Sequence, residues 1–260
     1  MSAWFHLCKK EFRLGLPALL IALAAYGLIL VLAVLFSWRS GHTADAIFIG
    51  SLICIFPHFF YLVFYMIISL QREKKKLHLW LANPMPGYQL ILAKLINSIV
   101  AMTISLVIIL SVCFMTFSML KIPYDDIINW SNIIRLGFLT IVHIYLFAID
   151  FAIWFIFFWI FYRVLVRRIG VLLSVIATIV LFGFIIYLLL KFESTGLYNI
   201  LTHWGGMSVQ SFFTGLALTH DEVRPAADFH VYLGSYLFEA VLCAILFYLS
   251  SWMLDRKVEV

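Results

Sequence analysis

Two carboxylates, and a histidine near one of them, stand out within the long apolar stretches of this 260-residue chain. Asp150 falls in the middle of the stretch Leu136–Tyr162, and Glu239 falls near the start of Val231–Leu254. A carboxylate at membrane depth costs about 2.5–3.5 kcal/mol on insertion scales, so such a group should face protein or water. His143 precedes Asp150 by two helical turns and shares its helix face. These three residues are therefore candidates for lining a pathway through a membrane.

Two other roles for the carboxylates are open. They could form structural hydrogen bonds between helices, with a Tyr, a Ser or His58 as partner, or they could be proton sites, although a proton path needs a chain of such groups. For catalysis, the sequence contains neither metal-binding Cys/His spacing nor the H-E-x-x-H and G-x-S-x-G motifs. We therefore expect no enzymatic activity and no metal or cofactor bound by this chain.

The elements that carry these residues are six apolar runs. The chain is 65% hydrophobic and 12% charged, with a mean hydropathy of +1.06, a composition that excludes a soluble domain. A helix needs roughly 20 apolar residues to cross a bilayer core of about 30 Å. The runs are Leu16–Ser37, Ala46–Leu70, Leu95–Leu120, Leu136–Tyr162, Ile169–Leu190 and Val231–Leu254. They predict an all-α integral membrane protein with one domain, residues 1–260, and Pro57 predicts a kink in the second span.

The basic residues are unevenly distributed between the two sides of these spans. Thirteen of the 18 Lys and Arg fall on the side that holds both termini, and the acidic residues of the loops lie mostly on the other side. Because Lys and Arg are retained in the cytoplasm, both termini are predicted to be cytoplasmic. The short loops suit a bacterial plasma membrane. The net charge of +5 is then a topology signal, and we expect no nucleic-acid partner.

The first 14 residues show a basic amphipathic pattern. On a helix, three aromatic residues share one side and three basic residues lie toward the other: Trp4, Phe5 and Phe12, then Lys9, Lys10 and Arg13. This pattern predicts an interfacial helix over residues 1–14 that lies among lipid headgroups. Gly15 and Pro17 would then turn the chain into the membrane. A frayed extension of the first span is the alternative.

The largest loop on the basic side joins the second and third spans. Leu77, Trp80 and Leu81 have i, i+3, i+4 spacing, which predicts a helix over residues 72–83 with one apolar ridge. Pro84 ends this helix. Docking into the groove of a partner protein and adsorption to anionic lipid explain this composition equally well.

The order of these parts resembles the permease subunits of ABC-2-type transporters, including Gram-positive peptide exporters such as the phenol-soluble-modulin exporters. Those permeases have an interface helix, six spans, and a helix between spans two and three with an acid, a base, two leucines and a proline, followed by a Lys at the third span. Six positions carry the resemblance here: Glu73, Lys74, Leu77, Leu81, Pro84 and Lys94. Lys75-Lys76 replaces the small Gly-Thr pair that many relatives have.

The resemblance implies that residues 72–83 are a coupling helix that docks on an ATPase subunit. Its docking residues would be Glu73, Lys74, Leu77, Trp80 and Leu81. ATP and Mg²⁺ would be bound by that ATPase, because this chain has no G-x-x-x-x-G-K-[ST] loop. A second permease copy or a paralogue would complete the transporter, which would move hydrophobic or amphipathic cargo outward. The alternative is a proton-coupled secondary transporter that uses Asp150 and Glu239.

Between the fifth and sixth spans, two further apolar pieces flank Gly205-Gly206. Leu197–Trp204 and Met207–Leu218 are each too short to cross a membrane at 1.5 Å per residue. We predict a re-entrant or outer helical hairpin over residues 191–230. A seventh span would place Arg256 and Lys257 outside, against the charge distribution.

Overall fold

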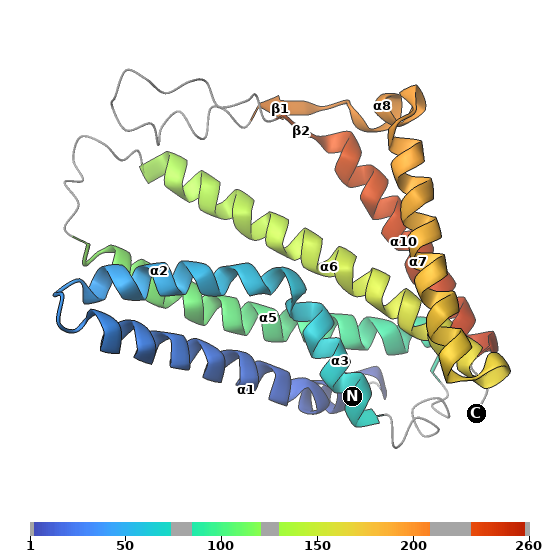
Figure 1. Ribbon diagram of the computed structural model, residues 1–260, viewed down its shortest axis with the longest axis horizontal. Coiled ribbons are helices and arrows are strands. Elements are labelled where there is room, and N and C mark those ends of the chain that lie inside the picture. Colours follow the sequence, from blue (N-terminus) through green and yellow to red (C-terminus); the bar gives the residue numbers. More distant parts are fainter. Residues whose placement is uncertain (1–2, 74–84, 121–129, 209–229, 258–260) are drawn as a thin grey trace. The chain divides into compact units, whose positions relative to one another are not determined.

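The computed structural model describes residues 3–73, 85–120, 130–208 and 230–257, and these residues are almost entirely helical (Figure 1). Six helices or helix pairs within this part of the chain are long and apolar enough to cross a membrane. They are Trp4–Ser37, Thr43–Arg72, Gly87–Phe117, Gly137–Ile169, Val171–Glu193 and Leu233–Arg256. The prediction of a multi-pass, all-helical membrane protein is thereby confirmed at the level of helix length and composition.

The chain divides into two compact units. The first consists of Met1–Lys121, Ile144–Phe155 and Leu254–Val260, and the second of Ile122–His143 and Ile156–Met253. Two helices, α6 (Trp130–Ile169) and α10 (Leu233–Lys257), contribute residues to both units.

The first unit is built around α5, a helix of 31 residues. Its elements are α1 (Ala3–Ser37), α2 (Thr43–Ile55), the 3₁₀ helix η1 (Phe56–Phe60), α3 (Tyr61–Glu73) and α5 (Gly87–Phe117). α1 and α5 lie side by side, and each also packs against α2 and α3 (Figure 1). The second span, Thr43–Arg72, consists of α2, η1 and α3 in succession.

The second span is interrupted where Pro57 occurs. Proline has no backbone N–H, so the i→i−4 hydrogen bonds of an α-helix cannot continue through it, and residues 56–60 adopt a 3₁₀ helix instead. His58 stabilises this interruption: its Nδ1 donates to the carbonyl oxygen of Cys54 at 3.0 Å, and its Nε2 accepts from the hydroxyl of Ser105 on α5 at 3.1 Å. The predicted kink is confirmed, and His58 is a packing residue within it.

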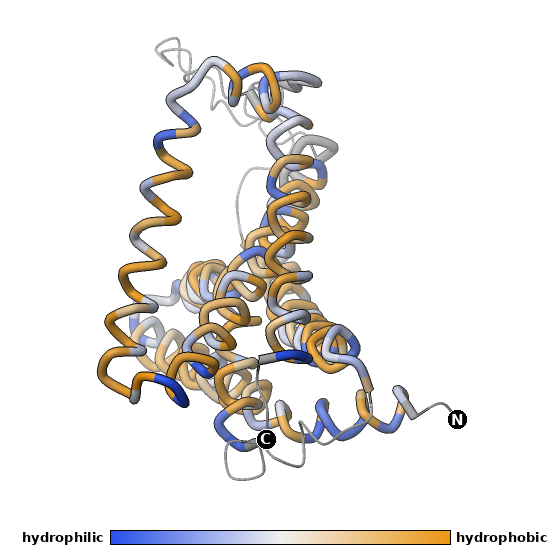
Figure 2. The backbone as a smooth tube through the Cα atoms, turned by 90° about the vertical axis from the view of Figure 1, so that its right-hand side faces the viewer, coloured by the Kyte–Doolittle hydropathy of each residue, from blue (hydrophilic) through white to orange (hydrophobic). Residues whose placement is uncertain are grey.

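α1 continues through Gly15 and Pro17, where we predicted that a separate interfacial helix would end. Figure 2 shows the first turns of α1 running in a different direction from the rest, so the chain turns within one bent helix. A proline inside a helix removes one hydrogen bond and bends the helix without necessarily ending it. Gly15 serves close packing, since a Cβ atom there would lie 1.8 Å from Cζ of Tyr65 on α3.

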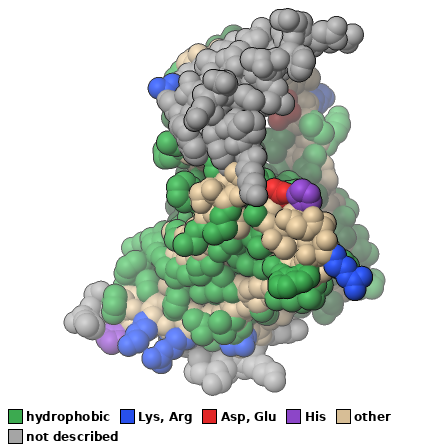
Figure 3. Space-filling model, turned by 90° about the vertical axis from the view of Figure 1, so that its left-hand side faces the viewer, with side chains coloured by type: hydrophobic (Ala, Val, Ile, Leu, Met, Phe, Trp, Pro, Cys, Tyr) green, Lys and Arg blue, Asp and Glu red, His purple; other side chains and the backbone are tan. Residues whose placement is uncertain are grey.

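Two hydrogen bonds between side chains join helices of the first unit, one buried and one exposed. The Tyr26 hydroxyl and Ser51 Oγ, 3.1 Å apart, join α1 to α2, and Thr103 Oγ1 and the Tyr145 hydroxyl, 2.7 Å apart, join α5 to α6. Many large hydrophobic side chains are exposed, and such side chains cover much of the face drawn in Figure 3. Figure 2 shows that apolar residues predominate along the helices. In a bilayer, apolar side chains gain little by leaving lipid for protein, so small residues and polar contacts hold helices together. The many exposed apolar side chains support the membrane assignment.

The second unit contains most of α6 and α10 together with four further elements. These are α7 (Val171–Glu193), α8 (Gly196–Thr202) and the short strands β1 (Gly206–Ser208) and β2 (His230–Tyr232). Gly170 separates α6 from α7 with a φ of 80°, a left-handed conformation that glycine adopts without strain. β1 and β2 pair antiparallel, with Met207 opposite Val231.

The predicted outer hairpin is only partly helical where the structure describes it. Residues 196–202 form α8, capped at its start by the Thr195 hydroxyl, which accepts from the N–H of Tyr198 at 3.4 Å. The second predicted helical piece was to begin at Met207, but Gly206–Ser208 form strand β1. Gly205, with a φ of 67°, stops helical continuation at this point. Residues 209–229 lie outside the described part.

Candidate functional site

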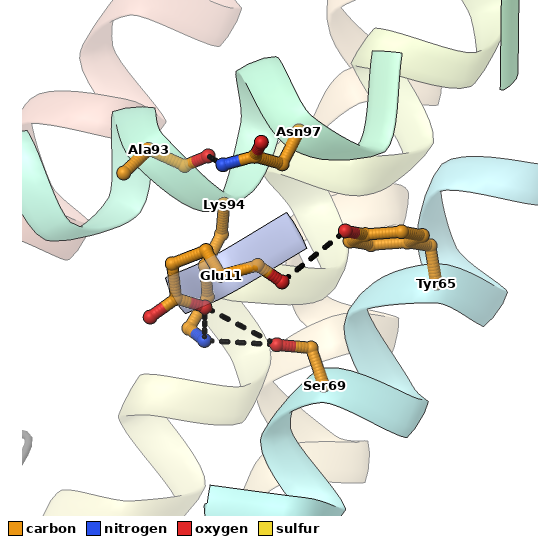
Figure 4. A network of polar contacts seen from close by, with 6 residues as sticks. All are labelled: Glu11, Tyr65, Ser69, Ala93, Lys94 and Asn97. Carbon is orange, nitrogen blue, oxygen red and sulfur yellow. Dashed lines mark hydrogen bonds and ion pairs between the residues drawn. The ribbon is translucent and has the colours of Figure 1, made fainter. Parts of the chain in front are cut away.

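A buried ion pair connects the first turns of α1 to α5 (Figure 4). Lys94 Nζ lies 2.5 Å from Glu11 Oε2. Glu11 is 1% exposed and Lys94 3% exposed, so both charges are removed from solvent. Desolvation costs several kcal/mol per ion, and the pair offsets that cost only with good geometry and additional hydrogen bonds.

The additional hydrogen bonds come from α3. The Ser69 hydroxyl donates to Glu11 Oε2 at 3.4 Å and accepts from Lys94 Nζ at 3.0 Å. The Tyr65 hydroxyl donates to the backbone carbonyl of Glu11 at 3.3 Å. Residues four apart share a helix face, so Tyr65 and Ser69 point together toward α1 (Figure 4). Three helices therefore meet at one polar contact.

The spacing of residues on α1 explains how Glu11 comes to face inward. Leu7, Glu11 and Gly15 are four residues apart, lie on one face and are all buried. Sequence reasoning missed this buried face because it grouped the aromatic and basic residues instead. The available signal was a single acid among Lys9, Lys10 and Arg13, at four-residue spacing from an apolar residue and a glycine.

A second contact fixes the beginning of α5. The N–H of Gly87, the first residue of α5, donates to Asp255 Oδ1 on the last turns of α10 at 2.6 Å. The first N–H groups of a helix have no partner within the helix, and a carboxylate there also interacts favourably with the helix dipole. The start of α1, the end of α3, the start of α5 and the end of α10 are thus joined by polar contacts within the first unit.

The predicted interfacial residues differ in their exposure. Lys9, Lys10 and Arg13 are exposed, whereas Trp4 and Phe12 are half-buried. Phe5 is 51% exposed. The interfacial helix stays a prediction, and the buried face of this segment is the one that carries Glu11.

The predicted coupling helix over residues 72–83 falls mostly outside the described residues. Glu73 is the last residue of α3, and Lys74, Leu77, Trp80 and Leu81 follow it in the part that the structure does not describe. The helix therefore stays a prediction. Its two flanking elements, α3 and α5, are the helices that meet Glu11 in the buried polar contact.

The predicted pathway residues lie in different surroundings. His143 Nδ1 donates to the carbonyl of Leu139 at 2.7 Å, which leaves Nε2 to accept from the hydroxyl of Tyr236 on α10. His143 is thus hydrogen-bonded between α6 and α10, whereas the sequence analysis considered such a structural role for the two carboxylates. Asp150 is half-buried on α6. It belongs to the first compact unit, whereas His143 belongs to the second.

Glu239 is exposed on α10. It follows Phe238, whose ring lies 5.7 Å from that of Tyr198 and 5.8 Å from that of Phe192. Burial, with smaller contributions from the carboxylates of Glu193 and Glu239, raises the pKa of Tyr198 above its usual value. Glu239 therefore lies beside an aromatic cluster that joins α7, α8 and α10.

Comparison with known proteins yields no relative. No protein-family model matches this sequence, and no curated protein or solved structure is significantly similar to it. Within the described residues, no group of three or more His, Cys, Asp or Glu side chains is arranged to hold a metal ion. The functional argument therefore rests on the six apolar helices and on the polar contacts that join their ends.

Proposed function

We propose that this chain is the permease subunit of an ATP-driven exporter of the ABC-2 type. It works with a separate ATPase subunit that binds ATP and Mg²⁺, and it moves hydrophobic or amphipathic cargo, peptide or lipid-like, out of a bacterial cell. Both termini and residues 74–84 are on the cytoplasmic side. Six apolar helices, the basic residues on one side and the pattern from Glu73 to Lys94 support this proposal.

The observation that carries the proposal is a set of polar contacts next to the connection between α3 and α5. These contacts join the start of α1, the end of α3 and the start of α5. A loop whose only task is to link two spans needs a handful of polar residues. Here the connection leaves α3 four residues after Ser69 and enters α5 seven residues before Lys94, and both residues contact Glu11. A partner that acts on residues 74–84 would therefore act on α1, α3 and α5 together.

The exposed surface of α7 supports a transporter with a second permease. Ser174 is the one fully buried residue among the 23 of α7. Leu172, Ile179 and Val180 are each more than 60% exposed. These apolar surfaces suit contact with lipid and with a second copy or a paralogue, as the proposed transporter requires.

Binding to an ATPase is tested by purifying the chain from its native membranes and sequencing the proteins bound to it. We expect an ATPase that contains a G-x-x-x-x-G-K-[ST] loop. Replacement of Trp80 and Leu81 by Asp should release this ATPase while the permease remains in the membrane, because the two residues form the predicted apolar ridge. Ala82→Asp, on the opposite side of the predicted helix, is the matched control and should retain the ATPase.

Transport is tested with the purified complex in proteoliposomes and a fluorescent cationic amphipathic peptide as the probe. We expect uptake that requires ATP and persists after the proton gradient is collapsed. Uptake that needs only a pH gradient, with no ATPase bound to the wild-type chain, would replace this proposal by the proton-coupled transporter.

A further inference from the structure

α3 is a short helix whose two ends are held by different contacts. It has 13 residues, begins where η1 ends and finishes at Glu73, directly before the connection to α5. A 3₁₀ stretch inside a longer helix often marks a hinge. The second span is therefore divided into α2, a hinge at η1, and α3. α3 leads to residues 74–84, the proposed ATPase-binding loop.

The end of α3 next to η1 is held by hydrogen bonds but can still bend. At η1 the regular backbone hydrogen bonds are already interrupted by Pro57, so bending there breaks few further bonds. His58 keeps both ring nitrogens bonded, one to Cys54 in its own span and one to Ser105 on α5. These contacts keep the hinge against α5 while α3 changes direction.

The opposite end of α3 is tied to two other helices. Ser69 contacts both Glu11 and Lys94, and Tyr65 contacts the backbone of Glu11 (Figure 4). If the last turns of α3 moved alone, these bonds would break and the ion pair would lose its hydrogen-bonding hydroxyl in a buried site. Separating buried charges is costly, whereas moving them together is not. Movement of the end of α3 therefore carries the first turns of α1 and the start of α5 with it.

We infer that Glu11 and Lys94 are positioning residues that tie the end of α3 to α1 and α5, so that these three helix ends move as one lever about η1. This inference rests on the proposed function, because it supplies the step from the ATPase-binding loop to the membrane helices. The ion pair is the transmitting contact, and Ser69 is the residue through which α3 joins it.

The test removes the attraction without leaving a lone buried charge. Glu11→Gln together with Lys94→Met keeps the approximate size of both side chains. The measured quantities are melting temperature, ATPase binding, ATP hydrolysis, and fluorescent-peptide transport per ATP hydrolysed in proteoliposomes. Lys191→Met, which removes an exposed Lys at the end of α7, is the matched control.

We expect the neutral double variant to bind the ATPase and to hydrolyse ATP within about twofold of wild type, while transport per ATP falls at least about fivefold, the range of a coupling between sites. A purely structural pair would change melting temperature and leave transport per ATP unchanged. The exchanged pair, Glu11→Lys with Lys94→Glu, should recover part of the lost transport, because attraction rather than residue identity is required.

Wild-type transport per ATP in the folded double variant would overturn the inference. If that variant does not fold, Glu11→Asp shortens the acid by one methylene group, and undiminished transport per ATP in this variant would have the same meaning. The proposed function fails in a different way, by the absence of any ATPase on the wild-type chain, and that result removes both proposals.

Discussion

Gly15→Ala should destabilise the protein strongly, because the Tyr65 ring occupies the space that the new methyl group needs. A Cβ atom at position 15 would lie 1.8 Å from Cζ of Tyr65, 2.1 Å from its hydroxyl oxygen and 2.3 Å from Cε2, whereas ordinary contacts begin at 3.4 Å. The ring must therefore retreat by about 1.6 Å, the difference between the ordinary and the shortest distance.

The size of the effect follows from two losses. Overpacking of this kind costs about 1–3 kcal/mol, and the displaced hydroxyl loses its hydrogen bond to the Glu11 carbonyl, which contributes about 0.5–1.5 kcal/mol. We expect the free energy of unfolding to fall by about 2–4 kcal/mol. At roughly 2–4 °C per kcal/mol for a chain of this size, the melting temperature should fall by about 5–15 °C.

The assay is thermal unfolding in detergent, followed by tryptophan fluorescence. Gly27→Ala is the matched control, because it lies on the same helix and a Cβ atom there would meet nothing within 4 Å. It should keep or slightly raise the melting temperature, since alanine favours helices over glycine. In a Tyr65→Ala background, Gly15→Ala should change stability by no more than about 0.5 kcal/mol, the limit of additivity for separate sites. Equal melting temperatures for the two glycine variants would refute the packing argument.

Two further predictions concern topology and the pathway. In a Cys-free background, single cysteines at Thr43, Asp126 and Thr219 should react with an impermeant thiol reagent in intact cells, and one at His78 should not; labelling at His78 would invert the orientation or add a span. Asp150→Asn should reduce peptide transport and peptide-stimulated ATP hydrolysis while basal hydrolysis and melting temperature stay near wild type, if this carboxylate lines the cargo route. A joint fall of melting temperature and both activities would instead make it a structural contact, and wild-type values throughout would exclude both roles.

The spanning helices could be predicted from the sequence because length and apolarity are local properties. Helix ends were less accurate: α6 begins at Trp130 and ends at Ile169, whereas the apolar run suggested Leu136–Tyr162. A helix continues past the apolar run as long as its backbone bonds are satisfied, so polar residues such as Arg135 and Arg167 remain helical. The bend at Pro57 was predictable because proline lacks an N–H.

The pairing of Glu11 with Lys94 could not be predicted, because the two residues are 83 residues apart. The spacing of Leu7, Glu11 and Gly15 indicated only that Glu11 faces inward. Lys94 was recognised through its place in the resemblance to ABC-2 permeases, not as a buried cation. Glu11 was passed over because the aromatic and basic residues around it gave a complete amphipathic pattern on their own. The strand at Gly206–Ser208 was missed for a related reason, since 21 residues, 209–229, separate it from its pairing partner, residues 230–232.

The distance in sequence between Glu11 and Lys94 also has a consequence for the order in which the protein is made. Chains grow at about 5–20 residues per second, so Lys94 leaves the ribosome roughly 4–17 s after Glu11. During that interval the acid has no cation from α5 to join in the protein interior, and a lone buried carboxylate is strongly disfavoured. The first turns of α1 should therefore remain at the membrane surface until the third span has been inserted. A nascent chain released before residue 94 would keep this segment undocked and accessible to protease, which makes the arrival of α5 the step that docks the first turns of α1.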